Sequence, residues 1–335
     1  MNKNDILSGV LEKARQMPQR IALPEATDPN ILQAAALLVE RGWGVPVLVG
    51  EPAAVREAAA SCGVNLNGME IEDCTSAERL RALVAAEHER KFYFSEEMLA
   101  ERAADPLSYA MMMLDVSWAD CVFAGVVYST NDVLLASNLF VGLRPGVKTP
   151  FSMSIHYCPG LAGDPDRIFA IGDASTCVKP DAGMLAEIAI GYCDCVQGLF
   201  GWDARCAMLS FSTCGSNDHE EAERVRQAVA IAQEKRPDLK IDGEFQLDAA
   251  VNPRVAARKV KRDSAVAGRA NVLVFPDINA ANIGYKLMQE FGHTEPVCLI
   301  IQGFAKPVGD CSRGDTPELL ATNMATLAAR AAMGV

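Results

Sequence analysis

Small polar and charged residues gather at four points in the sequence, each just after a short apolar run. Such residues can hold phosphate oxygens, because the start of a helix offers unpaired backbone N–H groups and the positive end of a dipole. In any single loop the same residues are more often simple helix N-caps. Four such loops together favour an anion site; they are residues 125–132, 212–216, 276–282 and 303–315.

Familiar nucleotide and hydrolase motifs are missing from the sequence. There is no GxxxxGK[ST], and no GxGxxG follows an apolar run, which disfavours nucleotide hydrolysis and a dinucleotide site. HExxH and GxSxG are also absent, and the four histidines, His88, His156, His219 and His293, stand in ordinary surroundings. A histidine-based catalytic triad is therefore not expected.

The eleven cysteines stand mostly alone in apolar stretches, without the spacing of a disulfide framework. Cys193 and Cys195 form one close pair, but no histidine lies near enough in sequence to complete a zinc signature. We expect reduced core thiols and no metal site.

Charge and hydropathy limit the possible partners. The 335 residues carry a net charge of −12, which argues against nucleic acid and against an anionic membrane surface. No apolar run approaches the roughly 20 residues needed to cross a bilayer, and residues 1–20 lack the apolar core of a secretory signal. The sequence therefore predicts a soluble, cytoplasmic protein with no membrane or nucleic-acid partner, although a local basic pocket for a small anion stays open.

Short apolar runs alternate with longer amphipathic segments, which is typical of strands alternating with helices in an α/β fold with a mostly parallel sheet. Predicted helices cover residues 27–41, 180–199 and 218–235. Predicted strands cover residues 20–23, 44–49, 121–124, 167–170, 207–211, 272–275 and 298–302.

One turn-rich segment interrupts this pattern at residues 144–150, where two prolines and a glycine occur close together. A return of the chain near Glu295-Pro296 would make the first domain discontinuous. The expected domains are residues 1–148 with 297–335, and residues 149–296.

The chain resembles the phosphate acetyl/butyryltransferase family over nearly its whole length. The matching stretches follow the family in order and spacing; they are residues 20–29, 105–107, 129–132, 145–149, 207–213, 241–244, 275–286, 302–307 and 312–314. The resemblance implies two α/β/α three-layer domains with mostly parallel sheets and an interdomain cleft that holds the site. It also implies a homodimer.

The same resemblance implies reversible transfer of an acetyl group between coenzyme A and orthophosphate, through acetyl phosphate and without a cofactor. The thiolate of coenzyme A attacks the acyl phosphate directly in a ternary complex. Because an ordinary thiol has a pKa of about 8.5, only a few per cent is thiolate at neutral pH, so a base is useful.

Carried over by position, Ser312 is expected to hydrogen-bond the sulfur and Arg313 to polarise the acyl carbonyl and then hold its oxyanion. A guanidinium suits that task because it stays charged and presents a planar fork of donors. Arg90 matches a phosphate-side arginine of the family, with a solvated helix charge as the equal alternative.

Five other residues are candidates for the cleft, of which Cys158 matches a cleft cysteine of the family. Cys158 belongs to a Cys-Pro pair, and we interpret it as packing rather than as a nucleophile, because the mechanism needs no acyl-enzyme. Ser129, Thr130, Asn282 and Lys306 are candidate donors to the substrates, although each can instead fix its own loop.

Two family positions differ in this chain. The aspartate taken as general base falls on Leu319, and an arginine of the phosphate site falls on Leu135. Asp315 and Glu318 are the local substitutes for the base and resemble the butyryl branch. Alternatively, Thr316 as N-cap, Pro317 and Glu318 form a good helix start with no catalytic purpose.

Two rival functions follow from these departures. The first is a regulatory module of the same fold that binds acyl-CoA without catalysis. The start at methionine, the end at Val335 and the lack of a second catalytic domain in the sequence argue against this expectation. The second is a transferase for propionyl or butyryl groups. An acetyl transferase is the favoured prediction.

Overall fold

The structure is a computed structural model that describes residues 3–158, 160, 167–173 and 175–334. The chain folds into two compact units. One, here called the discontinuous unit, comprises Leu7–Pro145 and Phe304–Gly334; the other, here called the central unit, is built mainly from Gly146–Gly303. The sequence predicts nearby boundaries, at 148/149 and 296/297. The second boundary differs because residues 297–302 continue a strand of the central sheet.

The elements of the discontinuous unit alternate as the sequence suggests. After α1 (Lys3–Gln16) come β1 (Arg20–Leu23), α2 (Pro29–Glu40), β2 (Val45–Val49), α3 (Pro52–Ser61), β3 (Glu70–Glu72), α4 (Ala77–Arg90), α5 (Glu96–Arg102), α6 (Pro106–Asp115), β4 (Cys121–Phe123), α7 (Thr130–Phe140), β11 (Val308–Gly309) and α13 (Pro317–Met333).

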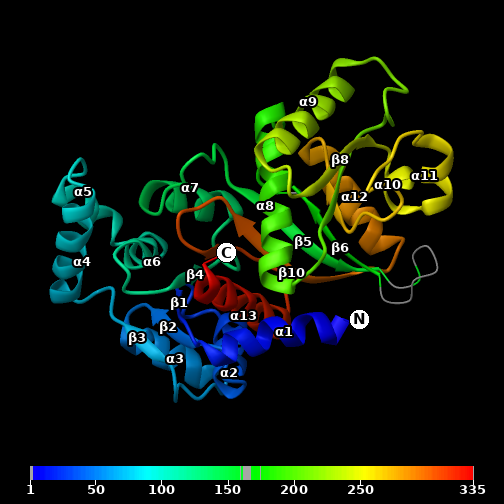
Figure 1. Ribbon diagram of the computed structural model, residues 1–335. Helices are drawn as coiled ribbons and strands as arrows, with labels where there is room; N and C mark the ends of the chain where they lie inside the picture. The colour runs from blue at the N-terminus through cyan, green and yellow to red at the C-terminus, as the bar shows by residue number, and fades with distance from the viewer. Residues whose placement is uncertain (1–2, 159, 161–166, 174, 335) are drawn as a thin grey trace. The chain divides into compact units, whose positions relative to one another are not determined.

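Five parallel strands form the sheet of this unit, in the order β11-β4-β1-β2-β3. Helices α2 and α13 pack against each other on one face, and α6 packs on the other (Figure 1). Ile21, Ala22 and Leu23 of β1 are fully buried, as expected for a parallel strand covered on both faces. The carboxyl ends of β1, β4 and β11 therefore lie side by side at one edge.

The central unit contains β5 (Phe151–Tyr157), β6 (Ile168–Gly172), α8 (Ala182–Phe200), β7 (Arg205–Leu209), α9 (Glu220–Lys235), β8 (Lys240–Phe245), α10 (Leu247–Val251), α11 (Pro253–Lys259), β9 (Val272–Val274), α12 (Ile278–Glu290) and β10 (Glu295–Gln302). Its sheet has the order β10-β5-β6-β9-β7-β8. The pairs β10–β5 and β5–β6 are antiparallel, and the other pairs are parallel. Helices α8 and α9 cover one face and α10 to α12 the other (Figure 1).

The predicted α/β class with mostly parallel sheets is confirmed. Helix α2 shows the local reason: the Asp28 side chain accepts hydrogen bonds from the N–H groups of Asn30 and Ile31, and Pro29 needs no donor at the first position. In the described part of the chain, none of the helices combines the length and the apolar character needed to cross a membrane.

Candidate functional site

Polar residues meet at the carboxyl ends of β1, β4 and β11, the edge at which open parallel sheets bind ligands. Three segments contribute: the residues after β1, the loop from β4 to α7, and the turn between β11 and α13. All three belong to the discontinuous unit.

Glu25, just after β1, is buried and fills the loop that follows β4. Its carboxylate accepts hydrogen bonds from the N–H groups of Gly125 and Val126, both at 3.1 Å, Val127 at 2.7 Å and Tyr128 at 2.9 Å. Successive N–H groups of this kind make an anion nest. An internal carboxylate occupies the nest, so the loop does not offer these four donors to a ligand.

Ser129 and Thr130 begin α7 immediately after that nest. Ser129 and Asp132 form a reciprocal capping box, with the Asp132 N–H donating to Ser129 Oγ at 3.2 Å. The Thr130 hydroxyl donates to Asp310 Oδ2 at 2.7 Å. Ser129 therefore fixes the helix start, and Thr130 joins it to the end of β11.

Ser312 and Arg313 lie in an exposed turn after β11. The Ser312 N–H donates to Asp315 Oδ2 at 3.1 Å, and the Asp315 N–H donates back to the Ser312 carbonyl at 3.0 Å, which closes the turn. Arg313 makes no hydrogen bond or ion pair with another residue of the described ranges. The pKa of Asp132 is lowered, mainly by the hydrogen bond from the Ser129 hydroxyl and to a smaller extent by the positive charge of Arg313. A guanidinium without a fixed partner can bind an anion or a carbonyl oxygen.

The two candidate bases differ in their surroundings. Asp315 is half-buried, and desolvation raises the pKa of its carboxyl. Glu318 is 61% exposed and pairs with Arg41, the C-cap residue of α2, at 2.5 Å. Asp315 thus stands beside Ser312, whereas Glu318 is held toward α2; Leu319 is in the first turn of α13.

Arg90 and Lys306 meet at the C-terminal end of α6, on the amino side of β4 and β11. Arg90 Nε donates to Asp115 Oδ2 at 2.8 Å, and Lys306 Nζ donates to the carbonyls of Leu114 and Asp115, both at 2.7 Å. A cation at this position stabilises the helix end. Both residues thus have structural partners at the other edge of the sheet from Ser312, and their substrate roles stay predictions.

A cavity of about 440 Å³ lies between the starts of α6 and α7 and contains Leu135 in its wall. Leu107 and Leu139 add apolar surface, and Tyr128 and Asp132 add polar groups. Leu135 is 60% exposed. The leucine therefore makes the wall apolar where the family resemblance implies an arginine.

The remaining two site candidates belong to the central unit. Cys158 is buried in the apolar cluster with Phe169, Leu209 and Phe245, and desolvation raises its pKa to about 11. It is a protonated thiol at neutral pH, which agrees with a packing role. Asn282 is exposed on α12, whose N-cap is Asp277.

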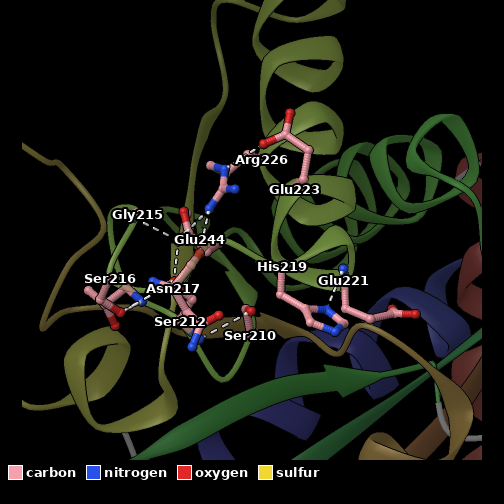
Figure 2. Close-up of polar contacts among 12 residues, drawn as sticks. Ser210, Ser212, Gly215, Ser216, Asn217, His219, Glu221, Glu223, Arg226 and Glu244 are labelled. Carbon is pink, nitrogen blue, oxygen red and sulfur yellow. Dashed lines mark hydrogen bonds and ion pairs between the residues drawn. The ribbon is translucent and has the colours of Figure 1, made fainter.

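A second predicted anion loop, after β7, is also filled from inside the protein. Glu244 of β8 is 1% exposed and accepts hydrogen bonds from the Ser212 hydroxyl at 2.7 Å and the Gly215 N–H at 2.9 Å (Figure 2). Arg226 of α9 pairs with the same carboxylate at 3.3 Å. The Glu244 carboxylate, paired with Arg226, thus fixes the loop after β7 from inside the protein.

Two carboxylates at the carboxyl ends of β1 and β11 were not singled out from the sequence. They are Glu25 and Asp310. Asp310 is 4% exposed and follows β11 directly. Its only sequence signal is its place two residues before Ser312. Within the described ranges, no group of three or more histidine, cysteine, aspartate or glutamate side chains is arranged to hold a metal ion.

Comparison with known proteins identifies relatives along nearly the whole chain. The family described as phosphate acetyl/butaryl transferase matches residues 5–329. A phosphate acetyltransferase of Acetivibrio thermocellus is 37% identical over 314 residues, which cover 93% of this chain and 94% of the relative. One of Bacillus subtilis is 37% identical over 315 residues, covering 94% and 95%.

Solved structures agree with these relatives. A phosphotransacetylase from Staphylococcus aureus superposes with a TM-score of 0.89 at 31% identity, with 99% of each chain covered. One from Streptococcus pyogenes gives 0.90 at the same identity and coverage. The chain therefore belongs to the phosphate acetyl/butyryl transferase family.

Proposed function

We propose that this protein is a phosphate acetyltransferase, which moves an acetyl group reversibly between coenzyme A and orthophosphate. The observation that carries the proposal is the exposed Arg313, which has no fixed anionic partner in the described structure and stands beside Ser312 at the carboxyl edge of the sheet. Family membership indicates the reaction, and the residues at the carboxyl ends of β1, β4 and β11 have the chemistry that this reaction needs.

Arg313 would hold the acyl oxygen. As the sulfur of coenzyme A attacks the carbonyl carbon of acetyl phosphate, a C–S bond forms and negative charge develops on the carbonyl oxygen. A guanidinium at that oxygen stabilises the charge, and one such donor is worth roughly a hundredfold or more in rate. The Ser312 hydroxyl would donate to the sulfur as it becomes a thiolate.

Asp315 is the better of the two candidate bases for the thiol. It lies in the same closed turn as Ser312, and a carboxyl with a raised pKa is closer to a thiol in proton affinity. Glu318 would first have to leave Arg41.

Binding of phosphate cannot use an arginine at position 135. The start of α7 beside Thr130 supports an anion through the helix dipole, and Arg313 offers an exposed cation. The reaction needs neither redox nor metal chemistry, so we propose coenzyme A, acetyl phosphate and orthophosphate as substrates with no cofactor. Assembly as a homodimer and a cytoplasmic location stay proposals.

The two rival functions are less well supported. A module that only binds acyl-CoA has no need of an exposed arginine beside a serine and a half-buried acid, and the relatives named above are enzymes. The apolar wall at Leu135 would suit a longer acyl chain.

One assay separates these possibilities. Purified protein is mixed with phosphate and acetyl-, propionyl- or butyryl-CoA, and release of the free thiol is followed with a thiol-reactive dye. We expect release that depends on phosphate and is fastest with acetyl-CoA. Binding of acetyl-CoA without release would indicate the regulatory module, and a faster reaction with butyryl-CoA would reassign the substrate.

A further inference from the structure

Transfer of an acetyl group from phosphate to coenzyme A moves two protons. The thiol loses its proton before or during attack, and the phosphate oxygen that leaves carbon must gain one, because fully ionised phosphate is a poor leaving group. In the reverse direction hydrogen phosphate must give up that proton as it attacks. Asp315 is the proposed base for the thiol of coenzyme A, so proton transfer to and from the phosphate oxygen needs a second acid–base group.

Asp310 is a buried acid, and the contacts described so far do not account for its burial. Its Oδ2 accepts a hydrogen bond from Thr130 Oγ1 at 2.7 Å, and its Oδ1 is buried without a hydrogen-bond partner in the described part of the chain. Glu25, which follows β1 in the same sheet, accepts four backbone hydrogen bonds instead. Buried polar atoms without partners are rare and costly, so Asp310 calls for an explanation.

The neighbouring backbone leaves room for this carboxyl. Gly125 has φ = 122°, and a Cβ at that position would lie 2.3 Å from Asp310 Oδ1 and 2.8 Å from the Cys311 nitrogen. A side chain at residue 125 would therefore displace the carboxyl. The loop after β4 is shaped to admit Asp310 behind Thr130.

We propose that Thr130 and Asp310 form a proton relay for the phosphate. When Asp310 is protonated, its Oδ2–H donates to Thr130 Oγ1, the reverse of the hydrogen bond that the carboxylate accepts. As the C–O bond of acetyl phosphate breaks, Thr130 Oγ1 gives its own proton to the leaving oxygen and takes the proton from Asp310 Oδ2. In reverse, hydrogen phosphate gives its proton to Thr130 Oγ1, and the threonine proton passes to the Asp310 carboxylate. Thr130 is the catalytic residue, and Asp310 acts through it. The relay rests on the proposed function and deepens it.

The charges around Asp310 suit this exchange. Burial raises the pKa of Asp310 to about 6, against the lowering effect of the Thr130 hydroxyl and the Cys311 N–H. Glu25, after β1, and Asp315, in the turn before α13, raise it further, and the Cys311 thiol beside it has a raised pKa and stays neutral. Thr130 is the first residue of α7, where the helix dipole favours a bound phosphate.

The test compares wild-type protein with Asp310→Asn, Thr130→Val and Thr130→Ser. Turnover of saturating acetyl-CoA and phosphate is measured across pH, and each variant is expressed as a ratio to wild type, so that the ionisation of phosphate cancels. Loss of a general acid–base group lowers turnover by about a hundredfold or more. We expect such a loss for Asp310→Asn and Thr130→Val above pH 6, a ratio that approaches one below pH 6, and near-normal turnover for Thr130→Ser.

Asp120→Asn is the matched control, because the same chemical change is made at the amino end of β4. The double variant Asp310→Asn/Thr130→Val should be no slower than the slower single variant, since one relay is lost once. A pH-independent ratio, additive losses, or full turnover in Thr130→Val would each overturn the relay.

Infrared titration gives a readout that does not depend on activity. A protonated carboxyl band that disappears with a midpoint near pH 6 should be present in wild type and missing in Asp310→Asn. If wild type transfers no acetyl group, the proposed function fails and the relay with it. If wild type is active and the band does not titrate, the relay alone fails.

Discussion

Asp310→Asn should make the protein more stable at neutral pH, although the change removes a charged group from the candidate site. Burial raises the Asp310 pKa from 3.8 to about 6, and each tenfold change in proton affinity corresponds to about 1.4 kcal/mol. The ionised carboxylate therefore lowers the free energy of unfolding by roughly 3 kcal/mol relative to the protonated form. Asparagine is neutral at every pH and can still accept the Thr130 hydrogen bond.

The sign of the pH dependence follows from proton linkage. Because the folded state holds this proton more tightly than the unfolded state, the contribution of Asp310 is fully present below pH 3.8 and is lost as the pH rises through about 6. Between about pH 4.5 and pH 8, wild type should lose about 2 kcal/mol relative to Asp310→Asn. The exposed Asp132 has a lowered pKa, so its stabilising contribution is present at neutral pH and is lost on acidification.

Tryptophan fluorescence can follow the relevant unit alone. The chain has three tryptophans, of which Trp43 and Trp118 belong to the discontinuous unit and Trp202 to the central unit. In a Trp202→Phe background, urea unfolding monitored by fluorescence therefore reports the unit that contains Asp310. Asp132→Asn in the same background is the control for the opposite trend. A wild-type minus variant difference that stays constant from about pH 4.5 to pH 8 would mean that Asp310 titrates normally, and the account of its burial would be wrong.

Four further substitutions test the site. Arg313→Ala should lower turnover by about a hundredfold or more by removing the oxyanion donor; equal turnover in this variant and wild type would remove it from the mechanism, and the exposed Arg81→Ala provides the charge control. Asp315→Asn should lower turnover at least about tenfold, whereas Glu318→Gln breaks an exposed ion pair worth less than about 1 kcal/mol and should change turnover little; the reverse order would exchange their roles. Glu25→Gln should lower the midpoint of thermal unfolding, since an amide cannot accept all four N–H groups and about 1–3 kcal/mol is lost; an unchanged midpoint would show that the nest tolerates an amide.

Local pattern was enough to find most of the sheets. Residues 20–23 are a short apolar run before a proline, and β1 covers the same four residues, fully buried at Ile21 to Leu23. Strand β8 was missed because it carries Asp242 and Glu244, which look like surface residues. In the structure, Asp242 pairs with Arg262 at 2.6 Å and Glu244 accepts from Ser212, so partners distant in sequence make these burials possible.

The same limit applies to the site. The sequence placed Ser312 and Arg313 in the loop after the predicted strand 298–302, whereas in the structure they follow β11, a two-residue strand that was not predicted. No local pattern could indicate that Lys306 caps α6, since its partners Leu114 and Asp115 lie almost 200 positions earlier. The filling of the loop after β4 by Glu25 also depends on the pairing of β1 with β4, which brings the ends of the two strands together.

The buried carboxylates that follow the strands differ in the number of hydrogen bonds that they accept. Glu25 accepts four hydrogen bonds, and Asp173, after β6, accepts from the hydroxyl and N–H of Ser152 and from the N–H groups of Ser175, Thr176 and Cys177. These donors satisfy the oxygens of both buried carboxylates from within the fold. Asp310 has one hydroxyl donor and burial that favours the neutral form. Burial raises the pKa of Asp310 to about 6, so its proton exchanges near neutral pH, and Thr130, whose hydroxyl donates to it, starts the helix at which an anion is favoured.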